Sequence, residues 1–458
     1  MSTTSNPLFG AFGGISSKQW KQQIQYELKG ADFNETLVWE SPEGIKVRPF
    51  YHRDDAQISH SAFAENPFLV CQEIFVFDVE KSARRANDSV NRGAESLRFA
   101  ISDEKIDVAK LISGLTFENL TLYFDLKFLS IDFVRHLDKA LDGRNFTVFA
   151  SIDPVGHLVQ DGNWFSKTDD YEFLKSLASE VKNLSVFSVD ARIYQNAGAN
   201  IVQQLAYALC HVTEYFNRFA IDKPTLFQVS VGPNYFFEIA KLRALRILFR
   251  TVADAFGSDS KVHILATPTK RNKTLYDYNV NMLRTTTECM SAILGSADAV
   301  CNLPYDALYH KSNEFGERIS RNQLLILKSE SYFDKVANAS DGAYYIENLT
   351  QQLANQTLIL FKELEAEGGF VAKLKDGSIQ RKVKESDQKE QALFDSGNEI
   401  LIGTNKYPNK NDRMKDDLEL YPFVKQKAKK TLFAPLVEKR LAEKSEQERL
   451  ASENDPKQ

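Results

Sequence analysis

The sequence predicts an α/β protein: a TIM (β/α)8 barrel with an N-terminal arm and a C-terminal helical extension. Eight short, apolar runs rich in β-forming residues follow one another from about residue 68. Longer segments with the 3.6-residue period of amphipathic helices separate these runs. The spacing leaves room for one crossover helix each, which parallel strands require. Eight such units over about 250 residues match the usual size of this barrel.

Several of the predicted strands are apolar on both faces, as expected for strands buried between a core and a ring of helices. A doubly wound open sheet is the alternative. Its usual Gly-rich first turn is missing from the sequence, which favours the closed barrel. The eight predicted strands are residues 68–76, 97–101, 120–126, 146–152, 185–194, 226–231, 261–267 and 299–303.

The N-terminal arm, predicted for residues 1–60, contains a helix near its start. Ser16 and Gln19 have the spacing of a capping box, which marks the first turn of a helix. Trp20 and Ile24 then follow at a spacing of four, which puts them on one helix face. We therefore expect a short amphipathic helix ahead of the barrel.

The rest of the chain divides into three predicted parts. The barrel takes residues 61–335, and a helical appendage over residues 336–420 packs on it. Residues 421–458 form a polar, charged tail in which Lys, Glu and Arg alternate with little apolar content. For this tail we expect a frayed polar helix or a disordered end rather than a binding arm.

Composition excludes several classes of function. The hydrophobic fraction of 43% and the charged fraction of 26% are typical of globular proteins. A net charge of -5 gives no positive field for non-specific binding to nucleic acid or to an anionic membrane. Cys71, Cys210, Cys289 and Cys301 form no CxxC pair, and the N-terminus lacks a signal-peptide pattern. We therefore expect a soluble, cytoplasmic protein with reduced thiols.

Candidate chemistry lies where the barrel strands end, because active sites of these barrels lie there. Ser188, Asp190 and Arg192 share one face of the fifth predicted strand by the period-two rule. Asp190 and Arg192 are suited to clamp a substrate. The alternative, an internal ion pair that fills the barrel, is the one we favour.

The loop after the seventh predicted strand is the second candidate. Lys270, Arg271 and Lys273 are suited to hold a phosphate-bearing ligand, although a solvated surface loop is the commoner explanation. His263 begins the seventh strand and is a candidate catalytic residue, but a single histidine in a barrel is more often held structurally. The histidines show no metal-binding spacing, and the sequence has no Walker, Rossmann or GxSxG motif.

Six motifs, in order along most of the chain, resemble those of the methylmalonyl-CoA mutases, which use adenosylcobalamin. Residues 195–199, Gln-Asn-Ala-Gly-Ala, resemble the QEAGA motif that follows the family's fifth strand. Residues 236–244 match the family's FFxEVAKxRA helix closely. Each motif alone is modest, but six in order at the expected barrel positions are specific. The other four are residues 28–33 with 43–51, 318–322, 341–347 and 402–407.

Departures from the family pattern indicate that the chain resembles the small, non-catalytic subunits of the family. The catalytic Tyr-His pair corresponds to Arg192 and Ile193, and isoleucine can neither donate a hydrogen bond nor transfer a proton. The Arg and Ser that hold coenzyme A fall on His263 and Leu265. Residues 152–158 resemble the DPxGxL motif of the small subunits. The sequence has no DxHxxG, the loop that supplies the lower cobalt ligand in the family's cobalamin domain.

The resemblance implies the small subunit of a heterodimeric methylmalonyl-CoA mutase, which interconverts methylmalonyl-CoA and succinyl-CoA. The large subunit would bind adenosylcobalamin and the acyl-CoA, while this chain would bind neither cofactor nor metal. Two alternatives remain: an autonomous acyl-CoA mutase barrel working with a separate cobalamin subunit, and a non-enzymatic scaffold. Bulky side chains on the barrel axis would favour the small subunit. The candidate residues at the barrel mouth are Asp190, Arg192, Gln195, His263, Lys270 and Arg271.

Overall fold

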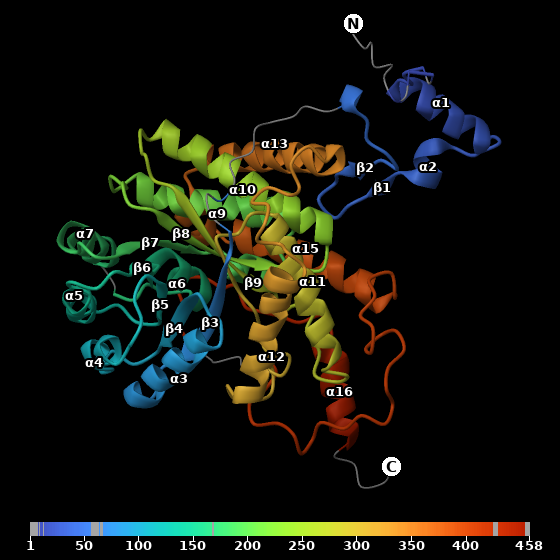
Figure 1. The fold of residues 1–458 in the computed structure, drawn as a ribbon. Helices are drawn as coiled ribbons and strands as arrows, with labels where there is room; N and C mark the ends of the chain where they lie inside the picture. The colour runs from blue at the N-terminus through green and yellow to red at the C-terminus, as the bar shows by residue number, and fades with distance from the viewer. Residues whose placement is uncertain are drawn as a thin grey trace, which may run out of the picture.

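The computed structural model describes residues 8, 10–11, 13–55, 64, 67–166, 169–424 and 429–453. Eight parallel strands close into a barrel in the order β10-β3-β4-β5-β6-β7-β8-β9, with helices around it (Figure 1). The prediction of a TIM (β/α)8 barrel is therefore confirmed. The barrel strands are β3 (Leu69–Phe75), β4 (Ser96–Ile101), β5 (Thr121–Leu126), β6 (Thr147–Ile152), β7 (Ser185–Asp190), β8 (Thr225–Val231), β9 (Val262–Pro268) and β10 (Ala299–Cys301).

Helices follow the barrel strands and bury one face against them. The ends of two of them follow from the sequence: Asn234 is the N-cap of α10, and Gly295 is the C-cap of α11. Among the described helices, none combines the length and the apolar content that crossing a bilayer requires. The helices are α3 (Val79–Asn91), α4 (Val108–Ser113), α5 (Ile131–Ala140), α6 (Pro154–Asp161), α7 (Asp170–Glu180), α8 (Arg192–Asn196), α9 (Ile201–Phe216), α10 (Tyr235–Ala255), α11 (Val280–Leu294) and α12 (Glu314–Leu325).

Strand β7 is shorter than the predicted strand 185–194. It ends at Asp190, and Arg192 opens the short helix α8. The chain leaves the sheet at Ala191, whose backbone has helical dihedral angles. Arg192 therefore does not continue the strand face shared by Ser188 and Asp190, and its side chain reaches Asp190 from the helix instead.

Two apolar clusters stabilise the barrel. The larger one lies between the strands and the surrounding helices and includes Val70, Leu97 and Phe124. Successive side chains of a strand point to opposite faces, so each strand contributes to the outside and to the inside of the barrel. The smaller cluster is the inner one, formed by Leu69, Cys71, Tyr123, Phe149, Leu226, Leu265, Ala299 and Cys301.

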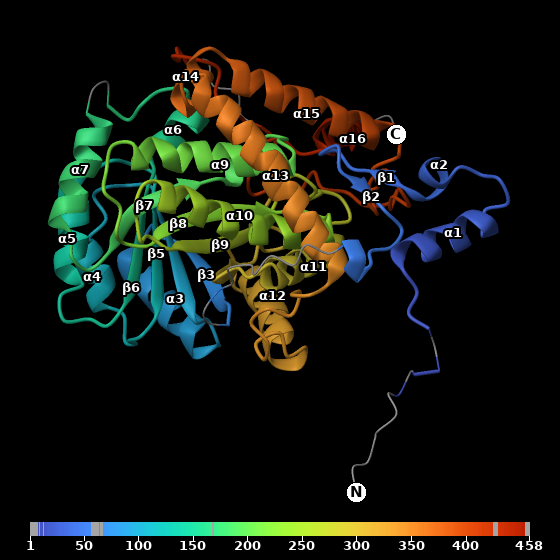
Figure 2. The same cartoon turned by 90° about the horizontal axis from the view of Figure 1, so that it is seen from above.

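The N-terminal arm projects away from the barrel (Figure 2). Its first helix, α1 (Ser17–Glu27), has no buried residue. The predicted capping box is present, with the Ser16 side chain accepting a hydrogen bond from the backbone N–H of Gln19. The predicted boundary between arm and barrel, at residue 60, lies outside the described residues.

The arm meets the barrel through a short antiparallel strand pair. After α2 (Phe33–Leu37), strands β1 (Trp39–Glu40) and β2 (Lys46–Val47) pair with each other. Trp39 packs edge-on against Phe237 of α10, with 5.8 Å between ring centroids. This aromatic contact fixes the base of the arm on the helical ring.

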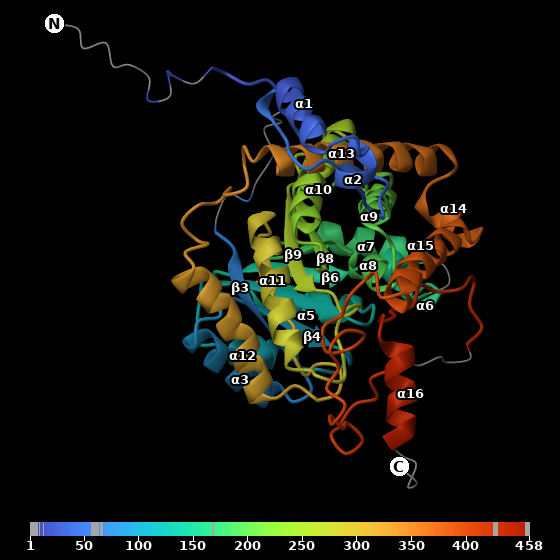
Figure 3. The same ribbon diagram turned by 90° about the vertical axis from the view of Figure 1, so that its right-hand side faces the viewer.

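Beyond the barrel, the chain first adds a helix outside α9 and α10 and then passes over the carboxyl ends of the strands (Figure 3). α13 (Tyr344–Ala366) packs along α9 and α10, and α14 (Phe370–Lys375) and α15 (Ser378–Asp395) follow. Residues 429–442, which we name the strap, then run along this end of the barrel. The strap is fixed by backbone hydrogen bonds from Leu432 N to Gly162 O at 3.0 Å and from Lys439 N to Asn196 O at 2.9 Å.

The strap and α16 (Glu443–Glu453) correct the expectation of a frayed or disordered tail over residues 421–458. Leu441 and Arg440 are buried. Arg440 donates to the carbonyl of Lys273 at 3.1 Å and to Glu446 at 2.5 Å. Within the strap, Phe433 and Leu436 are buried together with Arg440 and Leu441, whereas Leu432 and Val437 are exposed. The charged composition that predicted a solvated tail comes largely from exposed side chains.

Candidate functional site

The carboxyl ends of the barrel strands carry a network of charged side chains. Arg98 of β4 and Asp125 of β5 point into the barrel from neighbouring strands and form an ion pair. Arg98 Nη1 also lies 2.7 Å from Glu73 Oε2 on β3. Lys127 Nζ, just beyond β5, lies 2.8 Å from Asp125 Oδ1. Three adjacent strands thus contribute to one ion network at the barrel mouth.

Asp190 and Arg192 join this network from β7 and α8. Arg192 Nε donates to Asp190 Oδ1 at 2.7 Å, and Nη2 donates to Oδ2 at 2.6 Å, which is bidentate geometry. Arg192 Nη2 also donates to Asp125 Oδ2 at 3.3 Å. The ion pair that sequence analysis favoured over a substrate clamp is therefore present, and it is part of a larger network.

The network keeps Asp125 and Asp190 ionised despite their burial. Burial raises the pKa of Asp125, but the charges of Arg98, Lys127 and Arg192 outweigh burial and hold that pKa well below its usual range. Burial likewise raises the pKa of Asp190, whereas its pair with Arg192 lowers it to about 2. Three cations face three carboxylates, so the network is neutral overall.

The buried aspartate that follows β6 orients the end of β7. Asp153, in the segment that resembles DPxGxL, accepts a hydrogen bond at Oδ2 from Asp190 N at 2.7 Å. Its Oδ1 lies 2.7 Å from His211 Nε2 and accepts a hydrogen bond from the Tyr215 hydroxyl at 2.5 Å. His211 Nδ1 lies 2.9 Å from the hydroxyl of Tyr194 on α8. This chain of polar groups fixes the junction of β7 and α8.

Aromatic side chains close the amino-terminal end of the barrel. Tyr123 and Phe149 stack with ring centroids 5.6 Å apart, and His263 stacks on Phe149 at 4.4 Å. The Tyr123 hydroxyl lies 2.7 Å from His263 Nε2. Burial lowers the pKa of His263. His263 lies near the start of its strand, so the structure does not bring it together with Asp190 and Arg192.

The barrel axis is also filled between its two ends. Leu226 and Leu265 point inward from β8 and β9 as members of the inner cluster. Above them, Gln228 Nε2 donates to Ser151 Oγ at 2.6 Å, and Ser151 Oγ donates to Ser188 Oγ at 3.4 Å. Successive layers of aromatic, aliphatic, polar and charged side chains therefore occupy the interior.

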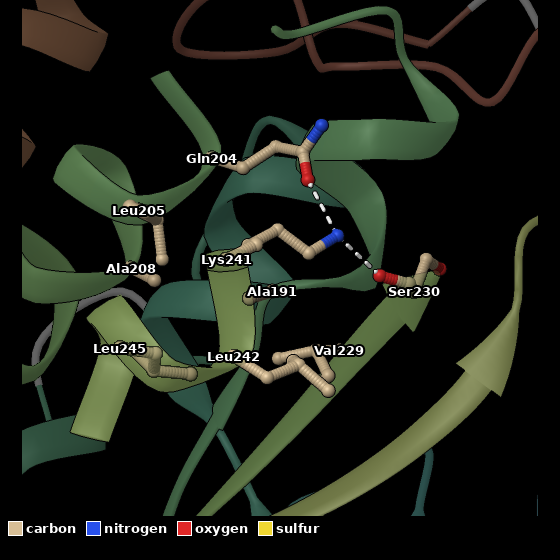
Figure 4. A pocket seen from close by; sticks show the side chains of 9 residues that line it. All are labelled: Ala191, Gln204, Leu205, Ala208, Val229, Ser230, Lys241, Leu242 and Leu245. Atoms are coloured by element: carbon tan, nitrogen blue, oxygen red, sulfur yellow. Dashed lines mark hydrogen bonds between the residues drawn. The ribbon is translucent and has the colours of Figure 1, made fainter. Parts of the chain in front are cut away.

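Gln195, another candidate at the mouth, belongs to a buried polar cluster between α8 and α10. Its Nε2 donates to Glu238 Oε1 at 2.9 Å, and its Oε1 accepts from Lys241 Nζ at 3.2 Å. Lys241 Nζ also donates to Gln204 Oε1 at 3.1 Å and to the Ser230 carbonyl at 2.7 Å (Figure 4). The adjoining cavity measures about 20 Å³, room for a single water molecule. Two of the family-like motifs, residues 195–199 and 236–244, therefore contact each other here, and the contact is structural.

The loop after β9 is buried by α15 and the strap, which corrects the expectation of a solvated surface loop. Arg271 pairs with Asp387 at 2.6 Å and with Glu390 at 2.5 Å, both on α15. Lys270, the exposed member of the loop, lies 3.1 Å from Glu438 of the strap. Residues more than a hundred positions later in the chain therefore supply the carboxylates that face this loop.

Lys273 has a local partner instead. Its Nζ lies 2.7 Å from Glu288 Oε2 on α11, and both side chains are almost fully buried. Asn272 Nδ2 donates to the same carboxylate at 2.7 Å. Burial lowers the pKa of Lys273 and raises that of Glu288. The three cations suggested as a phosphate site thus each have carboxylate partners of their own, and Arg271 has two.

Four residues that fill much of the interior were not predicted from the sequence: Arg98, Asp125, Tyr123 and Phe149. A signal for the first two was available. Both are charged residues inside runs that are otherwise apolar, and a charge in a strand buried on both faces needs a partner. Which partner each one finds depends on the register of neighbouring strands, and the sequence does not specify that register.

Comparison with known proteins identifies the family of the chain. Residues 149–452 match the family model described as methylmalonyl-CoA mutase. This chain belongs to the methylmalonyl-CoA mutase family. It is 33% identical to the methylmalonyl-CoA mutase small subunit of Porphyromonas gingivalis, over 92% of this chain and 74% of that subunit.

Two further mutase relatives extend the comparison. The chain is 25% identical to the methylmalonyl-CoA mutase small subunit of Streptomyces virginiae, over 89% of this chain and 72% of that subunit. It is 26% identical to the methylmalonyl-CoA mutase of Rhizobium meliloti, over 88% of this chain but 65% of that enzyme. This mutase-family chain is thus similar to small subunits over most of its length, and it spans less than two thirds of the Rhizobium mutase.

Proposed function

We propose that this chain is the small, non-catalytic subunit of a heterodimeric, adenosylcobalamin-dependent methylmalonyl-CoA mutase. The complex interconverts methylmalonyl-CoA and succinyl-CoA in the cytoplasm, as a step of propionate metabolism. In this proposal the large subunit carries the reaction, and the present chain stabilises it. One observation supports the proposal above all others: side chains fill the barrel from one end to the other.

A filled barrel is incompatible with a long acyl-CoA lying along the axis. Tyr123 and Phe149 stack inside the barrel, Leu226 and Leu265 pack in the same inner cluster, and Arg192 lies at the mouth. Within the part of the chain that the structure describes, these side chains lie where a substrate channel along the axis would have to pass. A substrate channel would need small side chains at each layer.

The positions that correspond to catalytic residues in the family also carry unsuitable chemistry. Arg192 is committed to two carboxylates, and the buried Ile193 has no group that could transfer a proton. His263 and Leu265, at the positions implied to hold coenzyme A, lie in the packed interior. This chemistry supports a scaffolding role.

The residues at the mouth do not fit adenosylcobalamin. Asp387 of α15 lies so close to Gly198 that a Cβ there would approach the Asp387 Cβ to 2.6 Å. The strap covers Asn196 through its backbone, and the charged groups beneath are paired with one another. A corrin ring would need this face to be free. We therefore assign the cofactor to the large subunit and derive no chemical step from this chain.

The arm and the post-barrel helices are the contact elements that we propose for the large subunit. α1 has no buried residue, and its Trp20 and Tyr26 are exposed. On α13, Ile359 is exposed as well. Apolar side chains on a projecting helix are typical of a surface that another chain covers.

Co-expression with the large mutase subunit tests the proposal. We expect a one-to-one complex by light scattering, mutase activity in the complex, and no activity from this chain alone. Tyr26→Ser on the arm should weaken the complex. Phe77→Ser is the matched control, because Tyr26 is 81% and Phe77 85% exposed, and Phe77 lies at the barrel mouth. A chain that stays monomeric beside the large subunit would contradict the proposal.

Calorimetric titration with acyl-CoA thioesters separates this proposal from an autonomous mutase barrel. We expect no saturable heat from this chain alone and saturable heat from the heterodimer. Saturable binding of methylmalonyl-CoA or succinyl-CoA by the isolated chain would overturn the non-catalytic assignment.

A further inference from the structure

Two cysteines face each other where the barrel closes on itself. β3 is its first strand and β10 its last, and the ladder between them pairs Cys301 directly with Cys71. Neighbouring strands lie about 4.8 Å apart. Disulfides form between residues whose Cα atoms are about 4.4–6.8 Å apart. The two cysteines therefore have the backbone spacing that a disulfide requires.

Both thiols point into the barrel and touch. Cys71 and Cys301 belong to the inner apolar cluster and are 4% and 2% exposed. Burial, followed by contact with the Cys301 thiol, raises the pKa of Cys71 well above its usual range. A protonated, buried thiol is a poor nucleophile. The pair is therefore unreactive while the barrel is closed.

The seam around β10 is a weakly paired part of the barrel. β10 has three residues. It pairs with β3 through Ala299, Val300 and Cys301, and with β9 through Ala299 and Val300. By comparison, β8 and β9 pair along the whole of Thr225–Val231. Segments with few backbone hydrogen bonds open locally at low free-energy cost. The seam can thus open locally at low free-energy cost, and such opening exposes both thiols together.

We propose that Cys71 and Cys301 form a redox-sensitive clasp, which links the first barrel strand to the last when a peroxide oxidises it. On opening, one cysteine thiolate attacks hydrogen peroxide, which breaks the O–O bond and gives a sulfenic acid and, with one proton, water. The second thiol then attacks the sulfenic sulfur, forms the S–S bond and releases another water. In total, two thiols and one peroxide give one disulfide and two waters.

The disulfide would enclose the entire barrel in one covalent loop, from Cys71 to Cys301. Closing a long loop lowers the conformational entropy of the unfolded chain and so stabilises the folded state. It would also hold the seam shut. The clasp depends on the barrel of this chain alone, and it goes beyond the role proposed for the heterodimer.

Peroxide treatment of the full-length protein, followed by alkylation and peptide mapping, tests the clasp. We expect one peptide pair joined through Cys71 and Cys301, lighter by two hydrogen atoms and separated again by a thiol reductant. Cys301→Ser should abolish this pair. Cys289→Ser is the matched control and should retain it, because Cys289 is equally buried but lies on α11 outside the barrel sheet.

Unfolding kinetics supply a second measurement. The oxidised protein should unfold at least about tenfold more slowly than the reduced protein, as expected for a long enclosed loop. Oxidised and reduced Cys301→Ser should unfold at equal rates. Backbone amide exchange of Val300 and Cys301 serves to establish that the seam opens under the conditions used. If the seam opens while Cys71 and Cys301 are recovered unlinked, or linked to Cys289, the proposal is wrong.

Discussion

The two ends of the barrel are closed by different chemistry. At the amino-terminal end, Tyr123, Phe149 and His263 stack in van der Waals contact. At the mouth, Arg98, Asp125 and their neighbours fill the interior of the barrel with ion pairs. Stacked rings retain most of their contacts when one group is removed. A buried charge that loses its partner keeps its full desolvation cost. The mouth should therefore tolerate substitution less well than the aromatic end.

The largest expected effect comes from removing one charge at the mouth. Asp125→Ala leaves Arg98, Lys127 and Arg192 without a shared carboxylate, so we expect a loss of about 3–5 kcal/mol in the free energy of unfolding. Urea unfolding measures it. Glu180→Ala is the control, since it breaks an exposed pair with Arg135 at 2.6 Å and should leave the midpoint unchanged. Equal losses in both variants would contradict a coupled network at the mouth.

Acid should separate the two ends, because their groups titrate in different ranges. The pKa of Asp190 is lowered from 3.8 to about 2. Its contribution, about 2 kcal/mol, is therefore present above pH 3.8 and is lost as the pH falls through about 2. Burial lowers the pKa of His263 from 6.5, so the unfolded chain takes up that proton first and stability already declines as the pH falls below 6.5.

Unfolding free energies measured across this pH range check both statements. Asp190→Asn should flatten the decline below pH 3.8, and His263→Gln should flatten part of the decline below pH 6.5. Each variant acts as the control for the other. If both variants change the same part of the curve, the two ends do not titrate independently.

A smaller, local effect concerns the strap, which closes the mouth from outside. Gly162 and Gly143 both have left-handed φ angles, of 77° and 73°. A Cβ on Gly162 would lie 2.6 Å from the carbonyl oxygen of Phe433, whereas nothing lies within 4 Å of one on Gly143. Alanine should add the same backbone strain at both sites, about 1–2 kcal/mol. Only Gly162→Ala should also release the strap.

Amide exchange at Leu432 reports on this release, because its N–H donates to the Gly162 carbonyl at 3.0 Å. We expect faster exchange at Leu432 in Gly162→Ala and unchanged exchange in Gly143→Ala. Similar protection in the two variants would show that the strap does not depend on this close contact.

The smallest effect is expected at the aromatic end. Tyr123→Phe retains both stacked rings and removes the hydroxyl that lies 2.7 Å from His263 Nε2. The half-buried histidine then loses one hydrogen bond, at a cost of about 1 kcal/mol. Tyr332→Phe, on an exposed side chain, is the control and should leave the urea midpoint unchanged. If Tyr123→Phe lowers the free energy of unfolding as much as Asp125→Ala does, the two ends do not differ in their tolerance of substitution.

The barrel itself could be predicted because its signals are local. Strand runs, helical periods and caps such as Ser16 and Asn234 depend on residues only a few positions apart. The end of β7 could not be predicted, since the apolar pattern continues past Asp190 while the backbone turns at Ala191 into a helix. A change of backbone direction does not alter the hydrophobic pattern of the sequence.

The site was harder to predict because it depends on register and on distant contacts. Asp190 and Arg192 are close in sequence, and their ion pair was foreseen. The pairing of Arg98 with Asp125 requires two strands to be aligned, and that of Arg271 with Asp387 joins residues far apart in the chain. In the strap, the exposed Leu432 and Val437 lie beside the buried Leu436 and Leu441, so its apolar residues do not mark one buried face in the sequence.

The long separation between Arg271 and its partners has a consequence for synthesis on the ribosome. Asp387 and Glu390 are translated 116 and 119 residues after Arg271. At about 5–20 residues per second, Arg271 emerges on the order of ten seconds before its carboxylates exist. During that interval Arg271 lacks the two carboxylates that pair with it in the folded chain, whereas Lys273 already has Glu288, 15 residues later. The charge of Arg271 is therefore neutralised only once α15 has been synthesised and has docked.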